Sequence, residues 1–514
     1  AMTTLQPNQK RDLAALAARA MAERGLLAEF PAAALGQAKE LDQIAEARVE
    51  NAESADVVDL TGLPWCSIDN DDSRDLDQLT VSQPLGDGTV RILVAIADVD
   101  SLVDKGSPID DYARHNTTSV YTSARIFPML PERLSTDLTS LNPGTDRLAI
   151  VCDMVVAADA AVLRSTITRA RVRNHVQLAY DAVAGWLEGR SAVPEAVEAV
   201  DGLEAQLVTQ DEVAQRLRAR RRAAGALAFQ TFQPRASFDG ERVVAIEQQV
   251  QNRARQLIEE FMIATNGEIA RYHGGKRRPS IRRVVRSPER WEKIRGVAAE
   301  YGESLPVEAD PVALQQFLAA RRASDPLRFP DLSLTVIKLM GAGEYVVERP
   351  GDTKLGHFGL AVRDYTHSTA PNRRFPDLVT QRLLKAALRD EKAPYGEAEL
   401  HQLAAHCTEQ EDAADKVERQ LRKSEAALLL AARIGEVFEA VVTGAARGNT
   451  WVRIVNPPAE GKLLQARERR VGERLKVRLE GTDFERGYID FAPFDEPTGT
   501  GSAETRRDGA PPGA

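Results

Sequence analysis

A strand pattern lies between two helical regions of this sequence. The segment `TVRILVAIADV` (89–99) is apolar enough for a buried strand, and the turn `LGDG` (85–88) before it predicts a hairpin. Five aspartates crowd the stretch that leads into this hairpin, `WCSIDNDDSRDLDQLT` (65–80). Like charges this close raise one another's pKa. We therefore expect a β-sheet with a positively charged group bound among the aspartates that precede its hairpin.

The rest of the chain divides into regions of different periodicity. Helical spacing of apolar residues predicts helices within 1–60, 165–225, 250–272, 378–390 and 396–434. Strands return in `FEAVVTGAARGNTWVRIV`, `GERLKVRLEGTD` and `GYIDFAP`, which favours a small barrel such as an OB-fold.

A chain of 514 residues is too long for one ordinary core. The fold class predicted is a multidomain α+β protein. Its parts are a helical, helix-turn-helix-like N-terminal domain (1–60), a mixed α/β domain (61–433), an OB-fold barrel (434–493) and a disordered tail (494–514).

Charge and cysteine content narrow the class of protein. The net charge of −9 argues against a coat-like nucleic-acid binder, although four basic clusters, one of them `GGKRRPSIRRVVR`, suit a polyanion. We find no run of roughly 18 apolar residues and no secretory pattern at the start, so no membrane partner is expected. The three cysteines lack disulfide or metal spacing. The economical location is the cytoplasm.

The aspartate run fits a metal site better than a calcium loop. A calcium loop starting at Asp69 would need glycine where Arg74 stands and glutamate where Thr80 stands. Asp75 and Asp77 are two residues apart at the start of a strand, so they share one face, and Asp69 can fold back over them. Converging carboxylates make a hard-oxygen site that suits Mg²⁺, with Mn²⁺ as the other possibility. The competing interpretation is a solvated acidic turn, which accounts for Asp71 and Asp72.

Longer blocks of the sequence resemble a known family. `IDNDDSRDLDQL`, `VAIADVDSLVDKGSPIDDYA`, `SVYTSARIFPMLPERLSTDLTSLNPGTDR`, `LIEEFMIATNGEIA` and `HFGLAVRDYTHSTAPNRRFPDLVTQRLL` are similar to the catalytic domain of the ribonuclease II / ribonuclease R (RNB) family. The resemblance covers roughly residues 60 to 430 in the family's order. The barrel expected near the C-terminus stands where that family carries an RNA-binding OB-fold.

The resemblance implies an activity and a set of residues for it. Family members are metal-dependent exoribonucleases that degrade RNA from the 3′ end to nucleoside 5′-monophosphates. The family's metal-binding acids correspond to Asp69, Asp75 and Asp77, and its fourth acid corresponds to Gln78, an amide without charge. The resemblance assigns catalytic roles to Asp75, Asp77 and Arg373, the last as the partner of the scissile phosphate. The implied partner is the 3′ end of single-stranded RNA, bound by a monomer.

RNA-binding residues follow from the same resemblance. Tyr121 and Phe229 would clamp the terminal bases by stacking, and Glu260 would lie near the terminal ribose. Arg374 and Glu418 would line the edge of the site. Phe229 could equally be a core aromatic.

The same blocks contain departures from the family and histidines that need an interpretation. Arg282 and Val285 stand where the family usually has tyrosine and histidine. His357 and His367 lack a second ligand at zinc spacing, and we interpret them as structural or phosphate-lining.

Two other function classes remain open on the sequence. One is an RNA-binding protein with an RNB-like fold that no longer cuts, with Gln78 as the lesion. The other is a DNA exonuclease or a metal-dependent phosphodiesterase for small molecules. A predicted barrel and a separate helical start favour a long polymer over a small molecule, and RNA is favoured over DNA by the resemblance alone.

Overall fold

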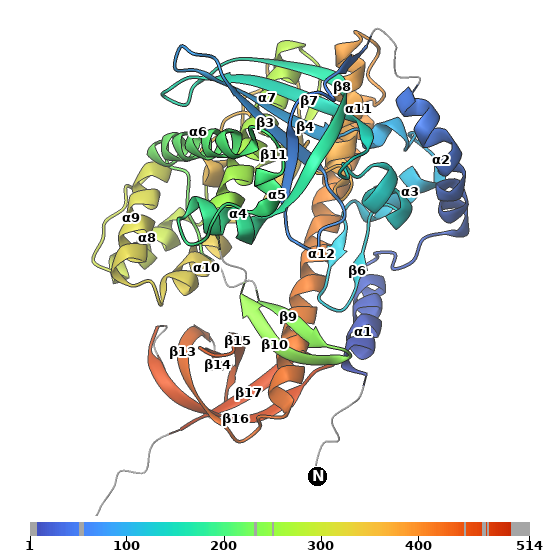
Figure 1. The fold of residues 1–514 in the computed structure, drawn as a ribbon. Helices are drawn as coiled ribbons and strands as arrows, with labels where there is room; N and C mark the ends of the chain where they lie inside the picture. The colour runs from blue at the N-terminus through green and yellow to red at the C-terminus, as the bar shows by residue number, and fades with distance from the viewer. Residues whose placement is uncertain are drawn as a thin grey trace, which may run out of the picture.

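The computed structural model describes residues 8–50, 56–230, 234–248, 251–446, 449–464, 469 and 472–494. A β-sheet flanked by helices and a separate small barrel confirm the predicted multidomain α+β architecture. In Figure 1 the sheet and its helices form the upper body, and the barrel lies below, beside the lower end of the long helix α12 (Glu397–Ala431). Apart from Phe494, the predicted disordered tail lies outside the described residues.

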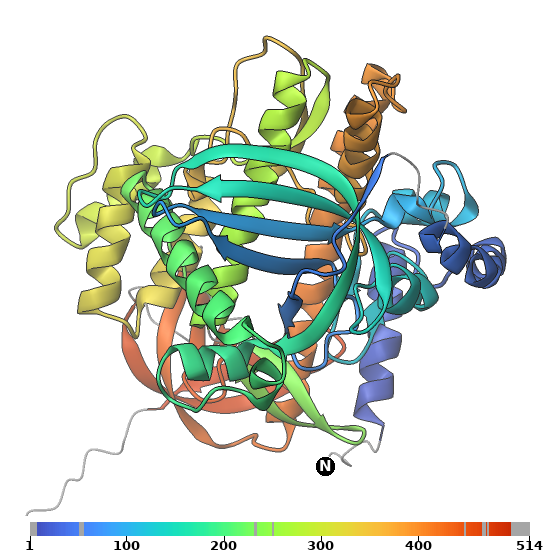
Figure 2. The ribbon, with the colours of Figure 1, turned by 45° about the horizontal axis from the view of Figure 1, so that its top comes forward.

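Six strands form the main sheet, in the order β1-β8-β2-β3-β4-β7. Figure 2 shows the central strands side by side. The predicted hairpin joins β3 to β4, with Gly86 and Gly88 both at φ +82°, a conformation that glycine adopts without steric cost. The bounds are β1 (Val57–Asp59), β2 (Trp65–Asp69), β3 (Gln78–Pro84), β4 (Val90–Ala97), β7 (Asp146–Val156) and β8 (Val162–Ala179).

Each face of the sheet packs against its own helices. Leu79 and Val81 of β3 join a core with α2 (Ala32–Glu50), α3 (Pro108–Asn116) and α11 (Phe375–Leu388). Thr80 points the other way and donates a hydrogen bond to Gln210 of α6 (Leu203–Ala223), 2.8 Å away. That second face is covered by α4 (Tyr180–Leu187), α6 and α7 (Arg253–Gly275). The sheet is therefore the middle layer of three.

The prediction that helix begins at residue 165 is wrong. Residues 162–179 form β8, which pairs with β7 along most of its length and with β2 at its end. Buried and exposed residues alternate along this segment, as in a strand: Ala170 and Val172 are buried, and Arg173 is exposed. A period of two is the strand signal, and pairing with two neighbours outweighs the local helix preference of the arginines and alanines.

The predicted N-terminal helices are present, but they do not share a core of their own. Leu13 and Met21 of α1 (Gln9–Glu23) are buried in a cluster with α12 and with the hairpin β9–β10. Ala34 and Leu41 of α2 are buried in the core on one face of the main sheet. Each helix is therefore held by the body of the molecule.

Smaller elements complete the body. A satellite cluster forms around Ile294, Leu314 and Phe329 of three helices, α8–α10, that lie beside α6 in Figure 1. The remaining elements are η1 (Val99–Ser101), β5 (Val120–Tyr121), β6 (Ile126–Phe127), η2 (Leu134–Leu138), α5 (Glu195–Glu198), β9 (Pro234–Asp239), β10 (Arg242–Gln248), β11 (Ser280–Val284), α8 (Trp291–Glu300), α9 (Pro311–Ser324), α10 (Phe329–Met340), β12 (Glu344–Glu348) and η3 (Phe358–Leu360).

The predicted C-terminal barrel is confirmed. Five strands close in the order β13-β14-β15-β17-β16 around Val452, Leu479 and Phe491. They are β13 (Val437–Ala446), β14 (Asn449–Ile454), β15 (Ala459–Leu463), β16 (Arg474–Asp483) and β17 (Tyr488–Pro493). Arg453 of β14 donates two hydrogen bonds to Asp331 of α10, at 3.0 and 2.7 Å, which ties the barrel to the body. Within the ranges described, no helix combines the length and apolar character needed to cross a membrane.

A buried glutamate where α12 meets the hairpin β9–β10 gives the fold a pH dependence. Glu425 is 2% exposed, and burial raises its pKa to about 7 although the Ser123 hydroxyl donates to it. Its pKa rises on folding from an ordinary value of 4.5, so its contribution to stability is present below pH 4.5 and is lost as the pH rises through 7. We expect Glu425→Gln to raise the free energy of unfolding by up to about 3 kcal/mol at pH 8 and by much less at pH 5. Thermal unfolding at both pH values measures this.

The exposed Glu439 of β13 provides the control for this prediction, since Glu439→Gln removes a carboxylate without relieving any burial. A gain for Glu425→Gln that is equal at both pH values would show that packing, and not ionisation, is responsible.

Candidate active site

Three predicted metal-binding acids meet where β2 ends and β3 begins. Asp69 is the last residue of β2, and Asp75 and Asp77 directly precede β3. Burial and then the charge of Asp69 raise the pKa of Asp75, and the charge of Asp75 in turn raises that of Asp77. The three carboxylates are therefore electrostatic neighbours. Asp71 and Asp72 are exposed, as expected for solvated turn residues.

Asp77 is the most deeply buried of these acids, with 3% of its surface exposed. Its Oδ1 accepts hydrogen bonds from the backbone amide of Asn372 (3.1 Å) and from Asn372 Nδ2 (2.9 Å). Burial raises the pKa of Asp77 to about 8, although the Arg373 guanidinium opposes this. A carboxylate that pays a desolvation cost of this kind gains most from a cation beside it.

The donor atoms suit a hard divalent ion, but the ligand set is not preassembled. Carboxylate oxygens are what Mg²⁺ and Mn²⁺ prefer. Among the residues that the structure describes, no three Asp, Glu, His or Cys side chains already surround a common ion position. Gln78 is paired with Ile96 in the sheet and follows Asp77 directly, so their side chains leave the chain on opposite faces.

Two consecutive arginines precede α11 and have different surroundings. Arg373 is exposed, lies close enough to lower the pKa of Asp75 and Asp77, and has no side-chain hydrogen bond or ion pair within the described residues. Arg374 turns inward and donates to Asp377 Oδ1 at 2.8 Å, where Asp377 is fully buried. Arg373 is thus available to a ligand, whereas Arg374 is engaged in the fold.

Tyr121 connects the acids to α12. Its hydroxyl donates to Asp75 Oδ2 (3.3 Å), and its backbone amide donates to Glu418 Oε1 (2.9 Å). The residue is 38% exposed, so it can be reached by a ligand. Tyr121, Glu418 and the acids, which are far apart in the sequence, therefore form one contact chain.

The two other predicted RNA-binding residues have partners of their own in the body. Glu260 of α7 is 2% exposed and accepts two hydrogen bonds from Arg221, at 2.8 and 2.6 Å. Phe229 is half-buried and packs against the satellite cluster of α8–α10. Their roles at the 3′ end stay predictions.

Sequence reasoning missed Asn372 and the residues around Asp69. Tyr180 follows β8, and the charge of Asp69 is among the causes that raise its pKa after burial itself. The Arg255 guanidinium lies 4.4 Å from the centre of the Tyr180 ring and donates to Asn70 Oδ1 at 2.8 Å. The available signal for Asn372 is its position in `PNRR`, directly before Arg373.

His357, His367 and Arg282 have hydrogen-bond partners within the fold. His357 Nδ1 accepts a hydrogen bond from the Leu360 amide (3.2 Å), and His367 Nδ1 lies 2.8 Å from the Tyr345 hydroxyl. Burial lowers the pKa of both rings. Arg282, which is 3% exposed, donates to Glu348 at 2.9 Å.

A cleft of about 790 Å³ lies between α10, α12 and the barrel. The acids do not line it, but Arg422 in its wall is one turn from Glu418 and donates to it at 3.5 Å. Basic side chains outnumber acidic ones along the wall. The basic residues are Arg283, Arg290, Lys338, Arg419, Arg422, Lys423 and Arg453, and the acidic ones are Asp331, Glu411, Asp412, Asp415 and Glu460.

Family models match most of this chain. The RNB domain matches residues 57–390, and the RNase II-type exonuclease C-terminal S1 domain matches residues 436–494. The first match holds the acids and both arginines, and the second coincides with the closed barrel.

Individual proteins agree with these models. Ribonuclease R of Escherichia coli (strain K12) is 30% identical over 488 residues, which cover 88% of this chain and 59% of that protein. The chain thus spans about three-fifths of that relative's length. The structure of Mycoplasma genitalium RNase R in complex with ribose methylated single-stranded RNA has the same fold, with a TM-score of 0.83 at 21% identity over 95% of this chain and 78% of that one. Yeast Ssd1, described as a pseudonuclease, shares the fold at a TM-score of 0.65 and 18% identity over 80% of this chain and 51% of its own.

The sequence matches and the geometry agree. The aspartates before β3 and the arginine before α11 fall inside the first matched domain, and the barrel after α12 falls inside the second. Nucleases of this class depend on divalent metal ions, and the carboxylate oxygens gathered here are donors that such ions accept. The chain belongs to the RNB-domain family of RNase II and RNase R proteins.

Proposed function

We propose that this chain is a 3′-to-5′ exoribonuclease that degrades single-stranded RNA processively to nucleoside 5′-monophosphates with Mg²⁺, or Mn²⁺ in its place. The main observation behind this proposal is that the Arg373 guanidinium lies close enough to Asp75 and Asp77 to lower their pKa values. Arg373 is exposed, and its side chain makes no hydrogen bond or ion pair with a described residue. A guanidinium held beside carboxylates but left unpaired suits a phosphate group. The matches to ribonuclease R support the substrate class.

Each residue has a proposed task at the 3′ end. Asp69, Asp75 and Asp77 hold the divalent ion. The Gln78 carbonyl is proposed as a further oxygen that reaches the ion from the other face of the chain, because its side chain leaves opposite that of Asp77. When bound, such an ion lowers the pKa of a water molecule and neutralises charge on the phosphate. Arg373 binds the non-bridging oxygens of the scissile phosphate, where charge develops during hydrolysis. Asp75 and Tyr121 stay in contact through their hydrogen bond, which fixes the ring at the edge of the site.

The proposal also includes RNA contacts outside the acids and Arg373. Tyr121 and Phe229 stack on bases, Glu418 orients Tyr121 through its backbone amide, and Glu260 and Arg374 act near the bound strand. The basic wall of the cleft between α12 and the barrel offers the RNA a path. The N-terminal segment (1–60), the catalytic body (61–433) and the barrel (434–493) are the proposed units of a monomer. Buried free thiols at Cys66, Cys152 and Cys407 suit the cytoplasm.

End-labelled RNA tests the proposal. With Mg²⁺, a single-stranded RNA labelled at its 5′ end should shorten progressively, and the same RNA labelled at its 3′ end should release labelled mononucleotide at once. EDTA should stop both reactions, and DNA of the same sequence is the control for the sugar. RNA that is bound but never shortened in Mg²⁺ or Mn²⁺ would replace this proposal with the RNA-binding alternative. The fold alone does not decide between them, because Ssd1 shares it.

The residue at position 78 gives a separate prediction. We expect Gln78→Asp to lower the Mg²⁺ concentration for half-maximal cleavage several-fold, because a bound cation turns the added negative charge into an attraction. The measurement is a Mg²⁺ titration of both proteins on one RNA. An unchanged requirement would mean that the side chain at 78 points away from the ion, which its alternation with Asp77 permits.

A further inference from the structure

Asn372 contacts Asp77 on one side and Thr139, the residue that directly follows η2, on the other. It is 1% exposed, and both its backbone amide and its Nδ2 donate to the same oxygen of Asp77, at 3.1 and 2.9 Å. Of the hydrogen bonds between described residues, these are the ones that the Asp77 carboxylate accepts. Oδ1 of Asp77 is therefore occupied by donors, and Oδ2 is left for another partner.

A second contact fixes which way the Asn372 amide points. The Oγ1 of Thr139, which is 5% exposed, lies 2.5 Å from Asn372 Oδ1 and 2.9 Å from the Leu134 carbonyl oxygen, and its single proton is shared between these two acceptors. With its oxygen facing Thr139, the amide presents its nitrogen to Asp77. A flipped amide would set its oxygen against the Asp77 carboxylate and would lose the hydrogen bond from Nδ2 to Asp77.

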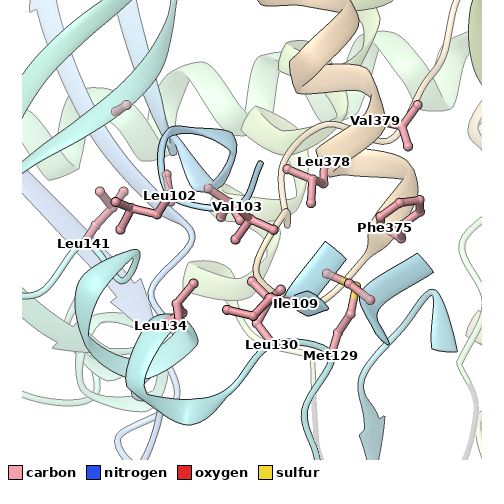
Figure 3. Packing of buried hydrophobic residues seen from close by; sticks show 14 of the residues in the cluster. Leu102, Val103, Ile109, Met129, Leu130, Leu134, Leu141, Phe375, Leu378 and Val379 are labelled. Carbon is pink, nitrogen blue, oxygen red and sulfur yellow. The ribbon is translucent and has the colours of Figure 1, made fainter. Parts of the chain in front are cut away.

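The surrounding core holds this chain of contacts in place. Leu134 and Leu141 lie on either side of Thr139 in the sequence and belong to the same buried cluster as Phe375 and Leu378 of α11 (Figure 3). Asn372, which donates to Asp77, and Thr139, which contacts Asn372, are thereby attached to packed elements. Thr139, Asn372 and Asp77 are consequently aligned by tertiary packing, as expected for groups that orient a metal ligand.

We propose that Asn372 is a positioning residue for the divalent ion, which it serves by fixing one oxygen of Asp77 so that the other faces the ion. This rests on the proposed metal-dependent function. Gln78 stands where the family has a fourth acid, so this site has one carboxylate fewer than that pattern to attract the ion. The affinity for the ion therefore depends more strongly on how the remaining carboxylates are oriented. Thr139 acts one step further out, by fixing the amide.

Binding of Mn²⁺ alone, followed by electron paramagnetic resonance without RNA, tests this inference. Asn372→Leu should bind Mn²⁺ about tenfold more weakly than the wild type. Thr139→Val should show a smaller loss, and Thr139→Ser, which keeps the hydroxyl, should stay near the wild type. Affinity for single-stranded RNA in EDTA should be unchanged in all three variants, because the cationic groups are untouched.

Two controls separate positioning from general damage to the fold. Asn116→Leu removes another asparagine that is 1% exposed and exchanges hydrogen bonds with Leu27, so its stability should fall while its Mn²⁺ affinity stays. In an Asp77→Asn background, Asn372→Leu should cause no further loss of Mn²⁺ affinity, because the oxygen it positions no longer carries the charge.

The outcomes are distinguishable. Wild-type protein that binds Mn²⁺ while Asn372→Leu and Thr139→Val bind it equally well overturns the inference and leaves the proposed function standing. An equal loss with and without Asp77 overturns it too, since Asn372 would then act through the fold. Wild-type protein that binds no Mn²⁺ overturns the proposed metal site, and this inference with it.

Discussion

Asp77→Asn is expected to lower RNA cleavage by about 10³-fold or more while RNA binding stays near the wild-type value. The substitution removes one negative charge from the metal-binding acids and keeps the size of the side chain. The basic wall between α12 and the barrel is unchanged, so the attraction for the RNA backbone remains. Single-turnover cleavage of 5′-labelled RNA in Mg²⁺ measures the first effect, and RNA binding in EDTA measures the second.

The same variant should unfold at an unchanged or higher temperature in the absence of metal. Burial raises the pKa of Asp77 to about 8, so an ionised carboxylate there costs folding free energy that asparagine does not. Asp72→Asn, on the exposed turn, is the matched control and should keep full activity. Appreciable cleavage by Asp77→Asn would remove Asp77 from the metal site.

Arg373→Ala should lower cleavage by about 10²- to 10³-fold, with a loss of stability well below that of Arg374→Ala, because it removes only the attraction of an exposed charge for Asp75 and Asp77. Its side chain is exposed and makes no hydrogen bond or ion pair with the residues described here, so the folded protein loses no contact. What is lost is the proposed bidentate partner of the scissile phosphate, which lysine replaces poorly. Cleavage under single-turnover conditions, with a thermal unfolding curve for the same protein, separates the two quantities.

The neighbouring arginine is the internal control for that prediction. Arg374→Ala should destabilise the protein by about 3–5 kcal/mol, because Asp377 would remain buried without its cation. Urea unfolding measures this loss. If Arg373→Ala unfolded as easily as Arg374→Ala, Arg373 would be a structural residue and the phosphate assignment would be wrong.

Local patterns in the sequence were enough to predict much of the fold. The glycines of `LGDG` and the apolar run after them define the hairpin β3–β4 because turn geometry and strand alternation are local properties. The same holds for α7, α11 and α12, whose apolar spacing continues over many turns, and for the barrel strands. β8 was missed because its alternation is interrupted by polar residues, and only pairing with β7 and β2 reveals it.

The candidate site shows what the sequence by itself determined. The spacing of Asp69, Asp75 and Asp77 indicates a site for a divalent ion, because neighbours two apart entering a strand share a face. The exposure of Asp71 and Asp72 also follows from their place in the turn. These features depend on a few consecutive residues.

Only the tertiary structure decided how the remaining side chains are used. Arg373 and Arg374 are identical in type and adjacent, yet one faces the acids and the other a buried aspartate. Glu260 is engaged by Arg221, and Asn372 reaches Asp77 across 295 positions of the sequence. Such contacts depend on how distant segments pack, because a buried polar group takes whichever partner the completed core places beside it.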